Sequence, residues 1–159
     1  MNSSFNFKHF IKAQKSSYPK ALREIANGKK VSHWMWYIFP QLRGLGISRS
    51  AKKYSISGIE EAVAYLADPI LGQRLIEISE ILLELPSNDA SEIFGHPDDL
   101  KLQSCMTLFA ASVPHNTYSV FQKVLDKYFD GHPRLETGPA RGLSASSALK
   151  ALEEKWLML

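Results

Sequence analysis

Apolar side chains recur along this chain at the spacing of a helix face. Over residues 58–66 they stand at i, i+3, i+4 and i+7. The most regular repeat begins after Asp68 and Pro69, a capping residue followed by proline at the first helical position, and it stops at Pro86. These patterns predict one helix over residues 58–66 and another between Pro69 and Pro86. The apolar positions of the second helix are Leu71, Leu75, Ile78, Leu82 and Leu85.

The N-terminal segment predicts two shorter helices. Asn6 is suited to cap the first helix, and Pro19 stands where the second would begin. Asn27 and Gly28 end the second helix, because both residue types favour the backbone conformation that terminates helices. The positions that face the core in this pair are Phe7, Phe10, Ile11, Gln14, Leu22 and Ile25.

The C-terminal half continues the helical pattern. A start signal at residues 96–99 places acids in the first turn, where the helix dipole favours them, and Pro114 ends the segment. A further helix closes at Asp130 and Gly131, residues 131–143 predict a loop, and Ser144 or Ser146 caps a last helix over residues 144–159. The apolar positions of these helices are Leu102, Met106, Phe109 and Val113; Phe121, Val124, Leu125 and Tyr128; and Leu149, Leu152, Trp156 and Leu159.

The pattern as a whole is typical of an all-α protein. No segment alternates convincingly at the period of a strand, and neither internal repeats nor a domain linker is present. We therefore expect residues 1–159 to form a single compact domain of about six or seven short helices, packed orthogonally rather than as an up-down bundle. The length of 159 residues fits one domain, and a composition of 45% apolar and 22% charged residues excludes intrinsic disorder.

Three features bear on the compartment. The longest apolar run is too short to span a membrane, and the N-terminus lacks the apolar region of a signal peptide. The single cysteine, Cys105, has no partner for an internal disulfide, which is typical of a reducing compartment. We expect a cytoplasmic protein that does not associate with a membrane.

Charge is distributed unevenly along the chain. Residues 1–53 hold eleven Lys or Arg and one acid, Glu24, whereas residues 54–159 hold eight basic and fifteen acidic residues. A basic segment of this kind attracts phosphates, nucleotides, nucleic acid or an acidic protein. The alternative is that the basic segment lies along the acidic one in the fold, so that their fields partly cancel.

Residues 28–48 bring aromatic and polar groups close together in sequence. The run at residues 34–39 is apolar on every face and is stopped by Pro40. One interpretation is a pocket wall, in which aromatic faces stack a planar ligand and flanking groups bind its polar edge or phosphate. The other, which composition alone favours, is a core element with solvated flanks. The flanking polar residues are Lys29, Lys30, Ser32, His33, Gln41 and Arg43.

Motifs in this segment carry a resemblance to a known family. They are Ser-His-Trp-Met-Trp at 32–36, Phe-Pro-Gln at 39–41 and Gly-Leu-Gly-x-Ser at 44–48. With further matches, such as Lys-Leu-x-Ser at 101–104, the chain resembles the domain-of-unknown-function 1810 family over roughly residues 5–135. The resemblance implies a small, mainly helical cytosolic protein and no established reaction. One departure is Arg134, which stands where the family pattern has an acid, although Thr137 is present.

The polar side chains of these motifs are candidate site residues, because packing alone is satisfied by apolar substitutes. His33 is the candidate general acid or base, since imidazole titrates near neutral pH. Lys101 and Ser104 stand three apart on one predicted helix and can touch, although the Ser104 hydroxyl can instead bond a carbonyl of its own helix. The candidate ligand-binding residues are Lys30, Ser32, Trp34, Trp36, Gln41, Arg43, Arg74, Lys101 and Ser104.

Some candidates have a structural alternative. Arg43 and Arg74 are suited to clamp an anion, but Arg74 beside an apolar stripe also fits a partly buried ion pair. Cys105 with His33 is a possible nucleophile pair, and a buried structural thiol is the alternative. Spacings typical of metal ligands do not occur, and Gly44-x-Gly46 lacks the third glycine of a dinucleotide fingerprint. We therefore expect neither a metal nor a cofactor.

Three functions follow from these observations. The leading hypothesis is a pocket for a small anionic or nucleotide-like ligand, built around the motif at residues 32–36 and the Phe-Pro-Gln segment. An alternative is a nucleic-acid or acidic-protein binding module that uses the basic N-terminal third. The last is a homo-oligomeric interaction protein that uses the apolar stretch at residues 156–159. The sequence determines neither a reaction nor the oligomeric state.

Overall fold

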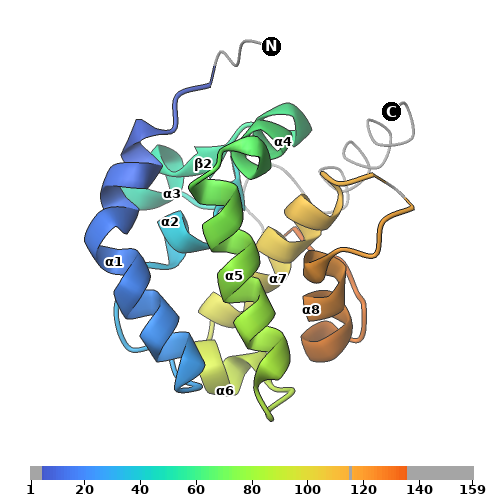
Figure 1. Ribbon diagram of the computed structural model, residues 1–159. Helices are drawn as coiled ribbons and strands as arrows, with labels where there is room; N and C mark the ends of the chain where they lie inside the picture. Colours follow the sequence, from blue (N-terminus) through green and yellow to red (C-terminus); the bar gives the residue numbers. More distant parts are fainter. Residues whose placement is uncertain (1–4, 115, 136–159) are drawn as a thin grey trace.

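The computed structural model of the chain describes residues 5–114 and 116–135. Within this part the protein is mainly helical, as predicted, with eight helices and one pair of short strands (Figure 1). In chain order the elements are α1 (Lys8–Ala26), α2 (Met35–Ile38), β1 (Gln41–Leu42), α3 (Arg49–Lys53), β2 (Ser55–Ile56), α4 (Ile59–Ala67), α5 (Leu71–Glu84), α6 (Ala90–Phe94), α7 (Asp98–Ala110) and α8 (Val120–Phe129). The helix predicted over residues 144–159 and the apolar stretch at 156–159 lie outside the described residues.

The two N-terminal helices predicted from sequence are one continuous helix, α1, with Pro19 inside it. A proline in a helix interior removes one hydrogen bond and crowds the preceding turn, at a cost of about 3 kcal/mol. Pro19 lies on the exposed side, whereas Phe10, Gln14, Tyr18, Ala21 and Ile25 form an unbroken buried face across it. The packing of that face outweighs the local preference for a helix start. Asn6 still supports the N-terminus, because its Oδ1 accepts a hydrogen bond from the Lys8 amide at 3.0 Å.

The helices predicted over residues 58–66 and between Pro69 and Pro86 are confirmed as α4 and α5. The Asp68 carboxylate accepts hydrogen bonds from the amides of Ile70 and Leu71 at 2.9 and 3.0 Å, as expected of a capping residue. Gly72 allows α5 to start close to α4, since a Cβ there would lie 2.0 Å from the carbonyl oxygen of Leu66. In Figure 1, α5 runs down the middle of the molecule between α1 and α8.

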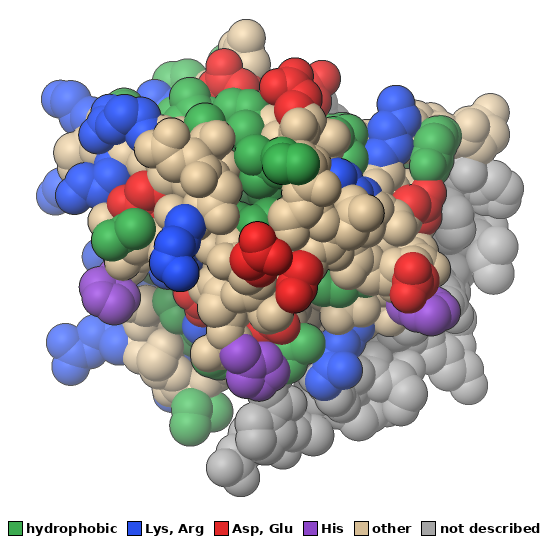
Figure 2. All heavy atoms as spheres, turned by 90° about the horizontal axis from the view of Figure 1, so that it is seen from below, with side chains coloured by type: hydrophobic (Ala, Val, Ile, Leu, Met, Phe, Trp, Pro, Cys, Tyr) green, Lys and Arg blue, Asp and Glu red, His purple; other side chains and the backbone are tan. Residues whose placement is uncertain are grey.

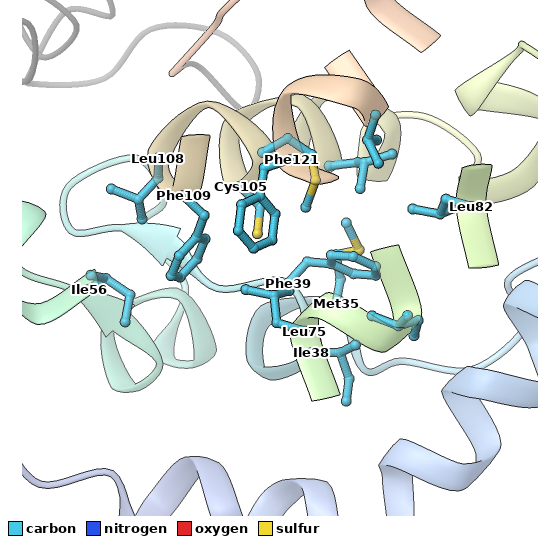
Figure 3. Close-up of a cluster of buried hydrophobic side chains, with 14 of the residues drawn as sticks. Met35, Ile38, Phe39, Ile56, Leu75, Leu82, Cys105, Leu108, Phe109 and Phe121 are labelled. Atoms are coloured by element: carbon cyan, nitrogen blue, oxygen red, sulfur yellow. The ribbon is translucent and has the colours of Figure 1, made fainter. Parts of the chain in front are cut away.

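Helix α7 is the centre of the core. Eight consecutive residues, from Leu102 to Phe109, are buried, so the apolar stripe predicted for this helix is only one of several buried faces. The helix packs against α6, α8, α4 and β1, and the burial of eight consecutive residues means that every face of its middle part is covered. Figure 3 shows side chains of α2, β2, α5, α7 and α8 meeting around Cys105 and Phe109.

Strands β1 and β2 form a parallel pair with Gln41 opposite Ser55 and Leu42 opposite Ile56. Sequence analysis did not predict them, because two residues are too few to show strand alternation. Between the strands, Ser48 caps α3 by accepting a hydrogen bond from the Ala51 amide at 3.1 Å. In the described part of the chain, none of the helices combines the length and the apolar character that crossing a membrane requires.

Candidate functional site

Two neighbouring cavities open beside the short segment that joins α1 to α2. The first, here called the lysine cavity, has a volume of about 240 Å³ and is lined by Lys30, His33, Trp34, Met35, Trp36, Tyr37, Ser50, Asp98 and Lys101. The second, the hydroxyl cavity, has a volume of about 440 Å³ and is lined by Ser17, Lys20, Val31, Ser32, His33, Trp34 and Tyr37. His33, Trp34 and Tyr37 line both, so the cavities adjoin along this segment.

Two lysines in the lysine cavity share one carboxylate. Asp98, in the first turn of α7, lies 2.9 Å from Lys30 Nζ and 2.8 Å from Lys101 Nζ. Both lysine side chains are largely buried, at 9% and 15% exposed. Burial opposes ionisation of Asp98, but hydrogen bonds and charge from Lys101 and Lys30 outweigh it and lower the Asp98 pKa. With the carboxylate ionised, the cluster of two lysines and one aspartate carries a net charge of +1.

The indole of Trp36 forms an aromatic side of the same cavity. Lys101 Nζ lies 4.7 Å from the centre of the Trp36 ring, a cation–π contact. On the loop behind the ring is Gly46, where a Cβ would come within 2.6 Å of the Trp36 side chain and 2.7 Å of Ala51 Cβ. The absence of a side chain at Gly46 therefore lets Trp36 take this position, and the ring remains half-buried rather than fully enclosed.

Glu24 on α1 organises the segment between the two cavities. Its carboxylate accepts hydrogen bonds from the Val31 and Ser32 amides at 2.7 and 2.9 Å. It also accepts the Ser32 hydroxyl at 2.6 Å and the Trp34 indole N–H at 2.9 Å. Burial raises the pKa of Glu24, but these hydrogen bonds, led by that of the Ser32 hydroxyl, outweigh it and lower the pKa to about 2.

Sequence analysis missed the role of Glu24. The signal was nevertheless present, because Glu24 is the one acid among the first fifty-three residues. Trp34, a predicted pocket residue, is 1% exposed and packs edge-on against Phe94, so most of its ring belongs to the core. Ser32 borders the hydroxyl cavity while its hydroxyl hydrogen is directed at Glu24.

His33 lies at the boundary of the two cavities with its side chain exposed. Its backbone carbonyl accepts a hydrogen bond from the Tyr37 hydroxyl at 3.3 Å. The imidazole is thus open to solvent and close to Lys30, Lys101 and Tyr37 through the shared lining. Its role as a general acid or base stays a prediction.

Gln41 on β1 does not line either cavity, yet it supports one of the lysines. It is buried, and its amide nitrogen donates to the carbonyl oxygens of Phe39 and Lys101, both at 2.8 Å. The second of these bonds ties β1 to α7 at the residue whose side chain enters the lysine cavity. The position of Lys101 thus depends on Gln41 through the backbone.

The other predicted ligand-binding residues lie elsewhere. Arg43 is exposed, with its Nε 3.4 Å from the Ser55 hydroxyl. Arg74 lies between α5 and α1, where it donates to Gln14 Oε1 at 3.3 Å and its guanidinium is 5.2 Å from the Tyr18 ring centre. Ser104 is fully buried within α7. None of these three borders the lysine or the hydroxyl cavity.

The thiol of Cys105 is buried in the core (Figure 3). Burial raises its pKa well above the ordinary value, so the thiol stays protonated and is a poor nucleophile. The structural alternative considered for this residue therefore fits better than a pair with the exposed His33. Within residues 5–114 and 116–135, no group of three or more His, Cys, Asp or Glu is arranged to hold a metal ion.

Comparison with known proteins places the chain in a family. The model of the family described as "Protein of unknown function (DUF1810)" matches residues 4–140. A crystal structure of the conserved hypothetical protein Rv1873 from Mycobacterium tuberculosis is similar at 45% identity and a TM-score of 0.78, over 82% of this chain and 92% of that one. No curated protein matches the chain. Because the family model spans most of the sequence, the chain belongs to the DUF1810 family of proteins of unknown function.

Proposed function

We propose that the protein binds a small anionic or nucleotide-like ligand in the lysine cavity. The observation that carries the proposal is the pair of largely buried lysines, Lys30 and Lys101, which share the single carboxylate of Asp98. Two ammonium groups offer six N–H donors. Two are directed at Asp98 and one, from Lys30, at the Ser32 carbonyl, which leaves three. A phosphate or carboxylate entering the cavity takes the remaining donors and neutralises the excess positive charge.

Burial makes this attraction stronger than it is at an open surface. Charges that are partly removed from water interact through a lower effective dielectric constant and are screened less by salt. Lysine binds phosphate as a compact point charge, and two lysines held by one carboxylate bring two such charges to the same place. The half-buried Trp36 ring, over which Lys101 Nζ lies, gives the cavity an aromatic side beside the cation.

His33 is the residue we assign to proton transfer should the bound molecule react. Its exposed imidazole borders both cavities, so it reaches a ligand in either. The buried, unpaired Cys105 is compatible with the reducing cytoplasm, which we propose as the compartment.

A thermal-shift screen tests ligand binding. The probes are inorganic phosphate, nucleoside mono- and diphosphates and sugar phosphates, each at low and moderate salt. A ligand at a hundred times its dissociation constant adds about 2.7 kcal/mol of stability, which a melting curve resolves. We expect a rise in melting temperature that persists at moderate salt. Lys101→Met should lower the apparent affinity for the ligand at least tenfold.

The matched control is Lys123→Met, which removes a lysine that also lies over an aromatic ring, 5.5 Å from the centre of Tyr118 on another part of the surface. This variant should bind the ligand as the unmodified protein does. Absence of any shift across the panel, or equal loss in the two variants, would contradict the proposal.

A second candidate function is nucleic-acid binding along α1. The exposed side chains of Lys8, Lys12, Lys15, Lys20 and Arg23 fall within about 140° of the helix circumference at 3.6 residues per turn. The acid of that helix, Glu24, is directed at Ser32 and Trp34 instead. Figure 2 shows Lys and Arg side chains gathered along the edge of the molecule on the α1 side.

Salt dependence separates this function from the first. If four phosphates are contacted, affinity for a short duplex falls about a hundredfold between roughly 50 and 200 mM salt. The double variant Lys12→Glu/Lys15→Glu should abolish binding and leave small-ligand binding in the lysine cavity intact. Duplex affinity that is unchanged by the double variant would remove this candidate.

A further inference from the structure

We infer that the lysine and hydroxyl cavities form one site for a phosphorylated sugar or nucleotide, with the phosphate at Lys30 and Lys101 and the sugar hydroxyls in the hydroxyl cavity. This inference rests on the proposed function and extends it by naming the ligand class. Its basis is that the two cavities share lining residues and that their remaining side chains differ in chemistry.

The two cavities share lining residues on one short segment. His33, Trp34 and Tyr37 line both, and Lys30 Nζ, which belongs to the lysine cavity, donates to the carbonyl oxygen of Ser32 at 2.7 Å. Ser32 in turn lines the hydroxyl cavity. A phosphate held by Lys30 therefore lies next to the segment that borders both cavities, and a substituent on that phosphate is directed toward the second cavity along His33, Trp34 and Tyr37.

The two volumes fit a ligand whose phosphate lies in one cavity and whose sugar lies in the other. Sites for drug-sized ligands measure roughly 300–1,000 Å³. The lysine cavity alone, at about 240 Å³, lies below that range and suits a phosphate-sized group. The adjoining 440 Å³ extends the site to the size of a nucleotide.

The hydroxyl cavity carries the groups that recognise a polyol. Ser17 Oγ and the Tyr37 hydroxyl lie 3.2 Å apart. Because the Tyr37 hydroxyl donates to the His33 carbonyl, the Ser17 hydroxyl donates to Tyr37, and both oxygens keep lone pairs that accept from a ligand. Ser32 Oγ directs its hydrogen at Glu24, which leaves its lone pairs as acceptors. Lys20 adds a donor, and the residues that line this cavity include no Asp or Glu. A sugar complements this set, because its hydroxyls donate to these acceptors and accept from Lys20, whereas a purely anionic or apolar group has no hydrogen to donate to them.

The two cavities predict separable contributions to affinity. Removing a hydroxyl from the second cavity weakens binding of a sugar phosphate but leaves binding of inorganic phosphate unchanged. Removing a lysine from the first weakens both ligands. If the ligand were confined to the lysine cavity, removing a hydroxyl from the second cavity would not change its affinity.

Isothermal titration calorimetry with ribose 5-phosphate, adenosine monophosphate and inorganic phosphate tests this inference. We expect the two organic phosphates to bind at least tenfold more tightly than inorganic phosphate. Ser17→Ala, at a hydroxyl that lines the second cavity alone, should reduce that ratio at least threefold and leave phosphate affinity unchanged; Tyr37→Phe, at a residue that lines both cavities, should reduce the ratio as well. The matched control Ser16→Ala, the exposed neighbour of Ser17, should change nothing.

The outcomes distinguish this inference from the proposed function. If the organic phosphates and inorganic phosphate bind equally, or if neither hydroxyl variant changes the ratio, the joined site is wrong while the anion site at Lys101 stands. If none of the probes binds, both are overturned. Lys101→Met should weaken all three probes, and its failure to do so would also contradict the assigned position of the phosphate.

Discussion

Two carboxylates define the candidate site at the scale of single residues, and they act differently. Glu24 is directed at backbone and side-chain donors and shapes the segment at residues 31–34. Asp98 faces two ammonium groups and holds them at the lysine cavity. The first carboxylate is thus a structural anchor, whereas the second competes with any anion that enters the cavity.

Asp98→Asn should tighten anion binding. The substitution removes a negative charge near the proposed phosphate position, which at a separation of about 6–12 Å and an effective dielectric constant of about 20 corresponds to roughly 10- to 100-fold in affinity. Calorimetry with inorganic phosphate, well below the melting temperature of the variant, measures the change in affinity. The neighbour Asp99→Asn, which removes a carboxylate paired with His96 instead, is the control. Weaker binding in Asp98→Asn would contradict this prediction and would mean that Asp98 positions the two lysines for the anion rather than competing with it.

Glu24→Gln should destabilise the protein in a pH-dependent way. The folded-state pKa of Glu24 is lowered from 4.5 to about 2, so its carboxylate stabilises the fold fully above pH 4.5 and loses this contribution as the pH falls toward 2. At pH 7 we expect a loss of roughly 1–2 kcal/mol, less than for a fully buried charge because the side chain is partly exposed. Urea unfolding of both proteins at several pH values measures the difference, which should shrink between pH 4.5 and 2. A difference that is constant with pH would contradict this assignment.

At the scale of elements, α1 shows tertiary packing overriding a local signal. Pro19 follows the pattern of a helix start, but the buried face from Phe10 to Ile25 passes through it. Helix α7 shows the same effect in a different form. Its polar residues Gln103, Ser104 and Thr107 are buried although their types are typical of a surface or a site. Thr107 Oγ1 satisfies its hydrogen-bonding by donating to the Gln103 carbonyl at 2.8 Å.

Pro19→Ala should stabilise the protein if α1 is continuous. Alanine restores an interior helical hydrogen bond, worth up to about 3 kcal/mol, whereas the more flexible unfolded chain opposes it by about 1 kcal/mol. We expect a net gain of roughly 1–2 kcal/mol in the free energy of unfolding. Had two helices met at Pro19, the same change would remove a favourable first-turn proline and lower stability. Chemical denaturation measures whether the free energy of unfolding rises or falls.

At the scale of the whole molecule, the chain beyond α8 returns to the central helix. Gln103 Nε2 donates to the His132 carbonyl at 2.9 Å, and the Arg134 amide donates to Thr107 Oγ1 at the same distance. Leu135 is fully buried in the core cluster. The segment after Gly131, predicted as a loop, is therefore part of the folded domain at least as far as Leu135.

Leu135→Ala should lower the free energy of unfolding by about 2–4 kcal/mol, since it leaves a cavity in a packed core. Ile47→Ala is the control, because Ile47 is 71% exposed and its truncation should change stability by less than about 0.5 kcal/mol. Urea denaturation of the two variants measures both effects. Equal, small changes in the free energy of unfolding would show that the segment ending at Leu135 does not contribute to the packed core.

Part of the candidate site could be predicted from sequence and part could not. The motif at residues 32–36 and Lys101 were singled out by their residue types, and Lys30, His33, Trp34, Trp36 and Lys101 all line the lysine cavity. Arg74 and Ser104 matched the same residue types but lie in an interhelical contact and in the core. Asp98 was noted only as a helix start, because its pairing with Lys30 spans elements that are distant in sequence.

The sequence by itself determined the helical class, the ends of α4 and α5 and the family, because periodicity, capping residues and local motifs act between near neighbours along the chain. Only the tertiary structure decided that α1 runs through Pro19, that α7 is buried on all sides, and that Lys30, Lys101 and Asp98 form one cluster. These features depend on contacts between residues far apart in sequence. Such contacts arise from the packing of whole faces, whose energy exceeds the local preference of any single residue.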